Sequence, residues 1–160
     1  MFAVKRKPDE WDDLLERTIY WKTLRVTAGA LRFTKNTRLK RNLRIKGPLT
    51  TEEINSARDC WVRKIQTDLQ PTLKAPGWKL IKKQSTGILR CKGRIFGYQP
   101  VYLEEGVFAE KLIRHSHQEM KHLGVANTMA EIRREWWIPQ LRSKVKKIMR
   151  SCIVCKFFST

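Results

Sequence analysis

The stretch that decides the fold lies near the C-terminus, where HQEMKH at residues 117–122 and CIVC at residues 152–155 enclose 29 intervening residues. Together they give His117-x4-His122 followed by Cys152-x2-Cys155, two imidazoles and two thiols. Two nitrogen and two sulfur ligands fill a closed tetrahedral Zn²⁺ shell. Because a closed shell leaves no position for water or substrate, the metal would stabilise a fold and would not catalyse a reaction. The alternative interpretation is two solvated histidines beside a chance cysteine pair.

Two histidines, His115 and His117, precede His122, and either could be the first metal ligand. The x4 gap between His117 and His122 lies within the usual zinc spacing. On an ideal helix His115 points about 200° away from His117, since each residue turns by about 100°. We therefore assign His117 to the metal and place His115 on the surface or behind the ligands. The order of the pairs also differs from a DNA-reading C2H2 finger, in which the cysteines come first.

The spacer between the two pairs predicts two helices. Thr128 with Glu131 three residues later is a capping box, so we expect a helix to begin at Thr128, with Met129, Ile132 and Trp136 on its apolar face. The proline of Ile138-Pro139 ends it. The next helix has an apolar and a basic face: Leu141, Val145, Ile148 and Met149 inward, and Arg142, Lys144, Lys146, Lys147 and Arg150 outward. Two short helices bury too little apolar surface to be stable alone, and zinc adds on the order of 10 kcal/mol or more in small zinc modules.

At this point the sequence resembles a known family. The residues that carry the resemblance are His117-x4-His122-x-Gly124, Thr128, Arg133, Trp137-Ile138-Pro139, Arg142, Val145 and Cys152-x2-Cys155. They resemble the zinc-binding HHCC (H2C2) N-terminal domain of integrases, and most closely that of BEL/Pao-type long-terminal-repeat retrotransposons, relatives of retroviral integrase. The resemblance implies a domain that does not cut or join DNA. It implies instead a helical bundle that supports multimer assembly and holds DNA ends near a separate catalytic core.

Upstream segments extend the resemblance over most of residues 20–157: residues 24–26 and 31–33, residues 47–53 with Ala57, Ile65 and Gln66, and residues 87–95. Three features depart from the family pattern. Leu123 stands where relatives have the first of two glycines, and Cys91 stands where a glycine or a small apolar residue is expected. The third departure is that the sequence stops five residues after Cys155. We therefore expect the integrase catalytic core, which carries an Asp, Asp and Glu set, to be absent.

Breaks and periodicity predict a mostly α-helical fold with a small β-hairpin element and a C-terminal, zinc-stabilised HHCC module. Residues 1–86 form a basic helical region: a helix capped by Asp9 whose apolar stripe runs to Leu31, a basic linker, and a helix capped by Thr50 and Glu53 that runs to about residue 69. A loop at 71–77 follows. Residues 87–106 form the hairpin region, with a hairpin and a third short strand within 87–103, and residues 107–160 form the zinc domain, beginning with a helix over about 107–120.

The charge of the chain indicates a polyanionic partner. Lys and Arg number 34 against 15 Asp and Glu, a formal net charge of +19. The densest basic run spans residues 35–46 and contains no acid. It predicts a phosphate-contacting linker or a nuclear-import signal, and the alternative is a solvated loop. The residues we predict to contact nucleic acid are Arg38, Lys40, Arg41, Arg44, Arg133, Arg134, Arg142, Lys144, Lys146 and Lys147.

These observations predict a zinc-binding, DNA-associated assembly module of a retrotransposon integrase. The expected partners are DNA, meaning element ends or target, and either an integrase catalytic core or a second copy of the chain. Two alternatives remain, a zinc-stabilised protein–protein interaction module and an RNA-binding module, since basic charge does not distinguish RNA from DNA. We expect no enzymatic activity from the chain itself. No signal peptide or membrane span is evident, which predicts an intracellular protein in the nucleus, the cytoplasm or both.

Overall fold

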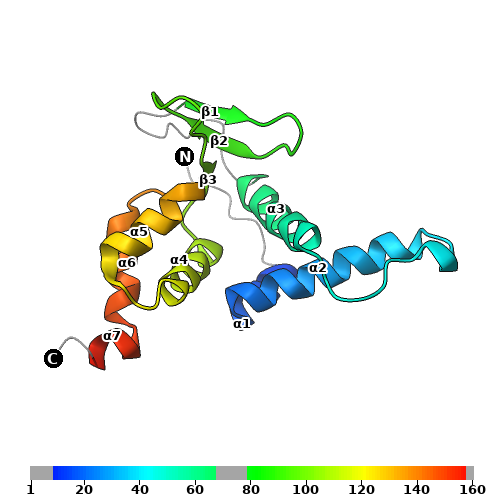
Figure 1. Ribbon diagram of the computed structural model, residues 1–160, viewed down its shortest axis with the longest axis horizontal. Helices are drawn as coiled ribbons and strands as arrows, with labels where there is room; N and C mark the ends of the chain where they lie inside the picture. The colour runs from blue at the N-terminus through cyan, green and yellow to red at the C-terminus, as the bar shows by residue number, and fades with distance from the viewer. Residues whose placement is uncertain (1–8, 68–78, 158–160) are drawn as a thin grey trace. The chain divides into compact units, whose positions relative to one another are not determined.

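The computed structural model describes residues 9–67 and 79–157, which divide into two compact units, residues 1–64 and 65–160. The chain is mostly helical with one small sheet, as predicted (Figure 1). No helix among the described residues has both the length and the apolar character that a membrane crossing requires. The predicted loop at 71–77 lies outside the described residues, and the predicted domain boundaries at residues 86 and 106 stay a prediction.

The first unit contains α1 (Glu10–Arg17), α2 (Tyr20–Thr37), the 3-10 helix η1 (Arg41–Leu43) and most of α3 (Thr51–Thr67). The prediction of one continuous helix with an apolar stripe from residue 10 to residue 31 is wrong. The helix breaks at Thr18 and Ile19, whose backbones are both extended. Two consecutive β-branched residues disfavour helix. In addition, the Thr18 hydroxyl bonds to the Leu14 carbonyl and to the Thr23 hydroxyl, which offers the chain an alternative to the helical ladder.

Two polar contacts join α2 and α3 within the first unit. The buried Trp61 indole donates a 2.9 Å hydrogen bond to the Thr27 hydroxyl. Arg32 forms a two-pronged ion pair with Glu53 and donates to the carbonyls of Gly47 and Pro48. Glu53 also accepts from the Thr50 backbone N–H, as the predicted capping box requires. The Arg32 hydrogen bond is the largest of the causes that lower the pKa of the Glu53 carboxyl to about 2.

The sheet of the second unit has the order β1-β2-β3-β4. A hairpin of β1 (Lys79–Lys82) and β2 (Leu89–Lys92) is followed by β3 (Val101–Tyr102). The prediction placed the whole hairpin within residues 87–103, and it was wrong because the first strand lies earlier, at β1. The Cys91 thiol is fully buried beside Tyr102, Leu80 and Leu89, and burial raises its pKa to about 12.

A buried glutamine fastens the end of α3 to this sheet. Gln66 accepts a hydrogen bond from the Leu89 N–H and donates to the carbonyls of Leu89 and Tyr102, at distances of 2.7 to 3.0 Å. Its side-chain amide thereby satisfies backbone groups of both β2 and β3. Tyr102 in turn stacks on Trp137, with ring centroids 5.4 Å apart.

The helical part of the second unit comprises α4 (Val107–Glu119), α5 (Gly124–Glu135), α6 (Leu141–Arg150) and α7 (Ile153–Phe157), and α4, α5 and α6 pack together (Figure 1). Helices α4 and α6 were predicted at nearly these bounds. The predicted helix start at Thr128 is wrong, because α5 begins one turn earlier at Gly124. Trp136 does not continue that helix either. It forms β4 (Trp136–Trp137), which pairs in parallel with β3.

Candidate metal centre

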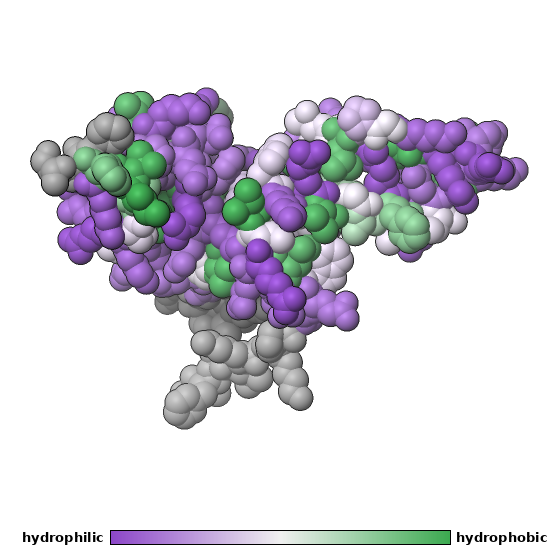
Figure 2. Space-filling model, turned by 90° about the horizontal axis from the view of Figure 1, so that it is seen from below, coloured by the Kyte–Doolittle hydropathy of each residue, from purple (hydrophilic) through white to green (hydrophobic). Residues whose placement is uncertain are grey.

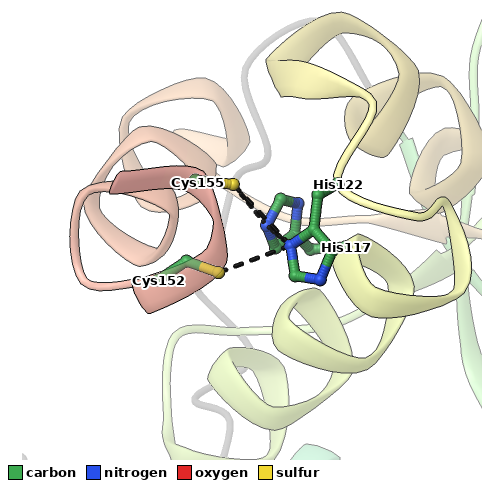
Figure 3. Close-up of side chains that lie close together, drawn as sticks. All are labelled: His117, His122, Cys152 and Cys155. Atoms are coloured by element: carbon green, nitrogen blue, oxygen red, sulfur yellow. Dashed lines mark hydrogen bonds between the residues drawn. The ribbon is translucent and has the colours of Figure 1, made fainter. Parts of the chain in front are cut away.

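The structure brings together the four residues that the spacing predicted to bind metal. His117, His122, Cys152 and Cys155 each offer a ligand atom, and all four atoms lie within 4.8 Å of one another (Figure 3). His117 is fully buried and the other three residues are half-buried. His115 lies half-buried on α4 and is not a member of this cluster.

The C-terminus of α4 explains why the x4 gap places the two imidazoles side by side. The N–H of His122 bonds to the carbonyl of His117 at 3.1 Å, and the N–H of Lys121 bonds to the carbonyl of Gln118 at 2.9 Å. This pair of bonds is a Schellman motif, in which the first and sixth residues of the closing turn lie in contact. The rings of His117 and His122 accordingly meet edge to face, with centroids 4.5 Å apart.

This turn also accounts for the missing first glycine of the family pattern. Lys121 and His122 adopt φ values of 49° and 62°, and Gly124 has a φ of 94°. Leu123 between them has an ordinary φ of −68°, which any residue adopts. Of the two positions that are glycine in the family pattern, only position 124 has the positive φ that favours glycine, and glycine is present there. Position 123 has no such requirement, so leucine fits the same turn.

The two cysteines come from the start of the last helix. Cys152 directly precedes α7, and its carbonyl accepts a hydrogen bond from the Lys156 N–H. Residues three apart at a helix start lie on one side of it, so both sulfurs face the histidines (Figure 3). The packing of α6 against α4 and α5 sets the position from which α7 begins.

The distances between the ligand atoms fit a single tetrahedral ion. Zn–N bonds of about 2.0–2.1 Å and Zn–S bonds of about 2.3 Å imply tetrahedral edges of roughly 3.3–3.8 Å. Cys155 Sγ lies 3.2 Å from His117 Nε2 and 3.7 Å from His122 Nδ1, and Cys152 Sγ lies 3.4 Å from His122 Nδ1. The two ring nitrogens, His117 Nε2 and His122 Nδ1, are 2.9 Å apart, which is below that range, as is the 3.2 Å distance from Cys155 Sγ to His117 Nε2. Two imidazoles and two thiols with this spacing suit Zn²⁺.

Thr128 sets which nitrogen of His117 faces the cluster. Its buried hydroxyl donates to the Gly124 carbonyl at 2.9 Å and lies 3.4 Å from His117 Nδ1. Because the single hydroxyl proton is used on Gly124, the oxygen can only accept, which places the imidazole proton on Nδ1 and leaves Nε2 free to bind metal. Burial, followed by the charges of His122 and Arg114, lowers the pKa of His117 and favours the neutral, ligating form.

The Cys155 thiol has a raised pKa, chiefly because of burial and then because of the hydrogen bond and charge of Cys152. Two thiolates this close to each other need a compensating cation, and a bound divalent metal provides one. The sequence prediction missed the role of Thr128, which it assigned to a helix cap. The signal that could have found it was the position of Thr128 within the family string.

Six of the residues predicted to contact nucleic acid lie in this second unit. The structure divides them into cations that line open hollows and cations that pair with other protein groups. Arg133, Arg142 and Lys146 line an open hollow of about 620 Å³ between the end of α5 and α6. Lys146 and Ser143 also line an adjacent hollow on α6, with Lys147, Arg150 and Lys156. Neither hollow has an acidic side chain in its lining. We name these six cations, Arg133, Arg142, Lys146, Lys147, Arg150 and Lys156, the α6 basic surface.

Lys144 and Arg134 have protein partners. Lys144 is half-buried, donates to the Pro139 carbonyl at 2.8 Å and forms an ion pair with Glu105, so its ammonium faces the protein. Arg134 is exposed and pairs with Glu131 at 3.1 Å.

The remaining predicted contacts, Arg38, Lys40, Arg41 and Arg44, are exposed residues in and around η1 of the first unit. On the face seen in Figure 2, hydrophilic residues predominate and apolar residues form smaller patches.

The metal cluster lies inside a segment that matches a protein family. Residues 107–160 match the integrase zinc binding domain. The match covers about a third of the chain and includes all four clustered side chains. No curated protein and no solved structure was found to match the chain. This segment is thus an integrase-type zinc-binding domain, and its cofactor is Zn²⁺.

Proposed function

We propose that this chain is a zinc-ordered, DNA-associated assembly module of a BEL/Pao-type retrotransposon integrase. In this proposal His117 Nε2, His122 Nδ1, Cys152 Sγ and Cys155 Sγ hold the zinc ion. The observation that carries it is the convergence of these four atoms within 4.8 Å inside the segment that matches the integrase zinc binding domain.

The metal has a structural role in this proposal. It joins the turn after α4 to the start of α7 and so fixes both ends of a small bundle. With all four coordination positions taken by protein, it supplies no activated water, and the module is non-catalytic. In this proposal Zn²⁺ and its four ligands join the end of α4 to the start of α7, so loss of the metal should loosen this region first.

The α6 basic surface supports the DNA-binding part of the proposal. Six cations in two adjoining hollows without an acid form a surface that suits successive phosphates of one backbone. Lys144 is outside this surface because its charge is engaged by Glu105. It therefore offers a matched control on the same helix.

The test is a titration of duplex DNA with the zinc-loaded chain over a series of salt concentrations. A Lys147→Ala/Arg150→Ala variant should lower the salt slope by about 0.9 per lost phosphate contact, and Lys144→Ala should leave the slope unchanged. Chelation of zinc should weaken binding through the α6 basic surface, because the helices that present it lose their common anchor. An unchanged slope in the double variant would contradict the proposed surface, and no binding at low salt would contradict DNA association.

A protein-interaction module is the second candidate, favoured by apolar side chains around the metal cluster. Leu123, Ile153, Val154 and Phe157 are all exposed, and the last is 80% exposed. Sedimentation of the zinc-loaded chain across a concentration series, with Phe157→Ser as the variant, tests self-association. Competition between duplex DNA and structured RNA at equal salt separates the RNA-binding alternative.

A further inference from the structure

The loop between β2 and β3 presents its apolar side chains to solvent. It reads Gly93-Arg94-Ile95-Phe96-Gly97, and Ile95 is 67% exposed while Phe96 is fully exposed. An exposed phenylalanine ring forgoes the favourable free energy that burial of its apolar surface would provide. Two adjacent apolar side chains exposed at one loop tip form a small patch that suits a contact outside the chain. We name residues 93–97 the β2–β3 tip.

The base of the tip is held in place on both sides. On the β2 side, Arg90 Nη1 donates to the Gln99 carbonyl at 2.8 Å. On the β3 side, the Tyr98 hydroxyl donates to the carbonyl of Arg133, at the end of α5. Gly97 turns the chain with a φ of 79°, which favours glycine. The exposed ring is therefore presented by a loop with anchored ends, so little ordering entropy remains to be lost on binding.

The sequence of the hairpin and the tip carries positive charge alone. Residues 79–103 contain six cations, Lys79, Lys82, Lys83, Arg90, Lys92 and Arg94, and no acidic residue. Lys79 and Lys92 stand directly opposite each other in the hairpin, on the face that also carries Arg90. Like charges opposed across a strand pair destabilise the sheet, and an anion bound between them removes this cost. The partner of the hairpin is therefore expected to be a polyanion.

The tip also adjoins the α6 basic surface. Arg133, whose carbonyl accepts the Tyr98 hydroxyl, lines the first hollow of that surface. A nucleic-acid backbone lying along the α6 basic surface can therefore continue toward the hairpin. At the tip it would meet an aromatic ring between cations, which is the arrangement that binds unpaired bases by stacking.

We propose that the β2–β3 tip binds an unpaired base, with Phe96 stacking on the base and Arg94 and Lys92 contacting the flanking phosphates. The substrate class is nucleic acid with single-stranded bases, such as an overhang or a frayed end. A duplex hides its base faces within the stack, and exposing one requires unfavourable unpairing and unstacking. This inference rests on the proposed nucleic-acid association and adds the form of nucleic acid that the chain prefers.

The test compares two labelled probes on the zinc-loaded full chain, a blunt duplex and the same duplex with a five-nucleotide 3′ overhang. Phe96→Ala should weaken binding of the overhang probe by about fivefold or more and change binding of the blunt duplex by less than about twofold. Phe96→Trp should restore overhang binding, because it provides a new π-face. Phe33→Ala is the matched control, since Phe33 is also an exposed phenylalanine, on α2.

Each other outcome overturns the tip proposal in a distinguishable way. An equal loss on both probes would make Phe96 a general support of DNA binding. No loss on either probe would leave DNA association standing without a role for the tip. If Phe96→Ala weakened binding to phosphatidylserine vesicles and left DNA binding unchanged, the tip would be assigned to a membrane surface. No binding of wild type to either probe at low salt would overturn DNA association itself.

Discussion

Replacement of Thr128 by valine tests how the protein prepares His117 for zinc. Valine keeps the shape and volume of the buried side chain and removes only the hydroxyl that faces His117 Nδ1. The imidazole then loses the acceptor that holds its proton on Nδ1. We expect weaker zinc binding and a disturbed ligand geometry, although all four ligands are intact.

The magnitude follows from the burial and the length of the lost contact. A buried donor left without an acceptor costs about 1–3 kcal/mol. The 3.4 Å separation is longer than the usual 2.9–3.0 Å, so the lower half of this range applies. About 1–2 kcal/mol corresponds to a loss of roughly 5- to 30-fold in zinc affinity, since 1.4 kcal/mol is a factor of ten.

The assay is a zinc titration of the full chain against a chelating indicator, together with the visible absorption of Co²⁺ bound at the same site. Thr128→Ser keeps the hydroxyl and should retain affinity within about threefold. Ile132→Val removes one methyl group from a buried residue one turn along α5, and so reports loss of stability alone. The Co²⁺ bands should shift in Thr128→Val and stay in place in Ile132→Val.

Two results would refute the reasoning. Zinc affinity of Thr128→Val within about twofold of wild type would show that the hydroxyl does not orient the ring. Equal losses in Thr128→Val and Ile132→Val, with the Co²⁺ spectrum unchanged in both, would reduce Thr128 to a packing residue.

Three further predictions test the ligand choice, the buried thiol and the first unit. His115→Ala should leave zinc affinity within about threefold of wild type while His117→Ala abolishes tight binding, as checked by indicator competition; the reverse result would contradict the ligand assignment. Cys91 should resist iodoacetamide at pH 8 in the native chain and react on unfolding, because burial raises its pKa to about 12 and hides the sulfur; mass spectrometry showing native labelling would contradict its burial. Glu53→Gln should unfold at lower temperature than wild type at pH 7, because the Arg32 ion pair is lost. The pKa of Glu53 is lowered from 4.5 to about 2, so its stabilisation is complete above pH 4.5 and disappears as pH falls toward about 2. Melting curves should therefore converge at low pH, and a difference that grows on acidification would be inconsistent with this ion pair.

The metal motif could be found from sequence because its geometry is mostly local. The Schellman turn brings His117 and His122 together whatever the rest of the fold does, and a helix start brings Cys152 and Cys155 together in the same way. Residue types then select zinc. The helix caps at Asp9 and Thr50 were predictable for the same reason, since their hydrogen bonds join residues three apart.

The errors occurred where distant contacts compete with local preference. Trp136 fits the apolar spacing of α5, but the chain instead extends there to pair with Val101, 35 residues earlier. Thr128 has the signature of a cap, yet the Schellman turn already places Gly124 at the start of the helix, and the threonine side chain turns to His117. The spacing of apolar residues within one segment cannot predict such a contact, because the residue that pairs with the segment lies far away in the sequence.

The sequence by itself determined the His-x4-His and Cys-x2-Cys motif, the helical class, the excess of positive charge and the resemblance to the integrase zinc binding domain. Each follows from residue type and from spacing along the chain, whereas the approach of the histidine pair to the cysteine pair depends on contacts between residues 30 or more positions apart. Only the tertiary structure decided which cations gather on one surface, that Lys144 is engaged by Glu105, and that Phe96 protrudes from an anchored loop. These depend on packing of α6 and the hairpin against other elements, and side-chain exposure is a property of the folded chain as a whole.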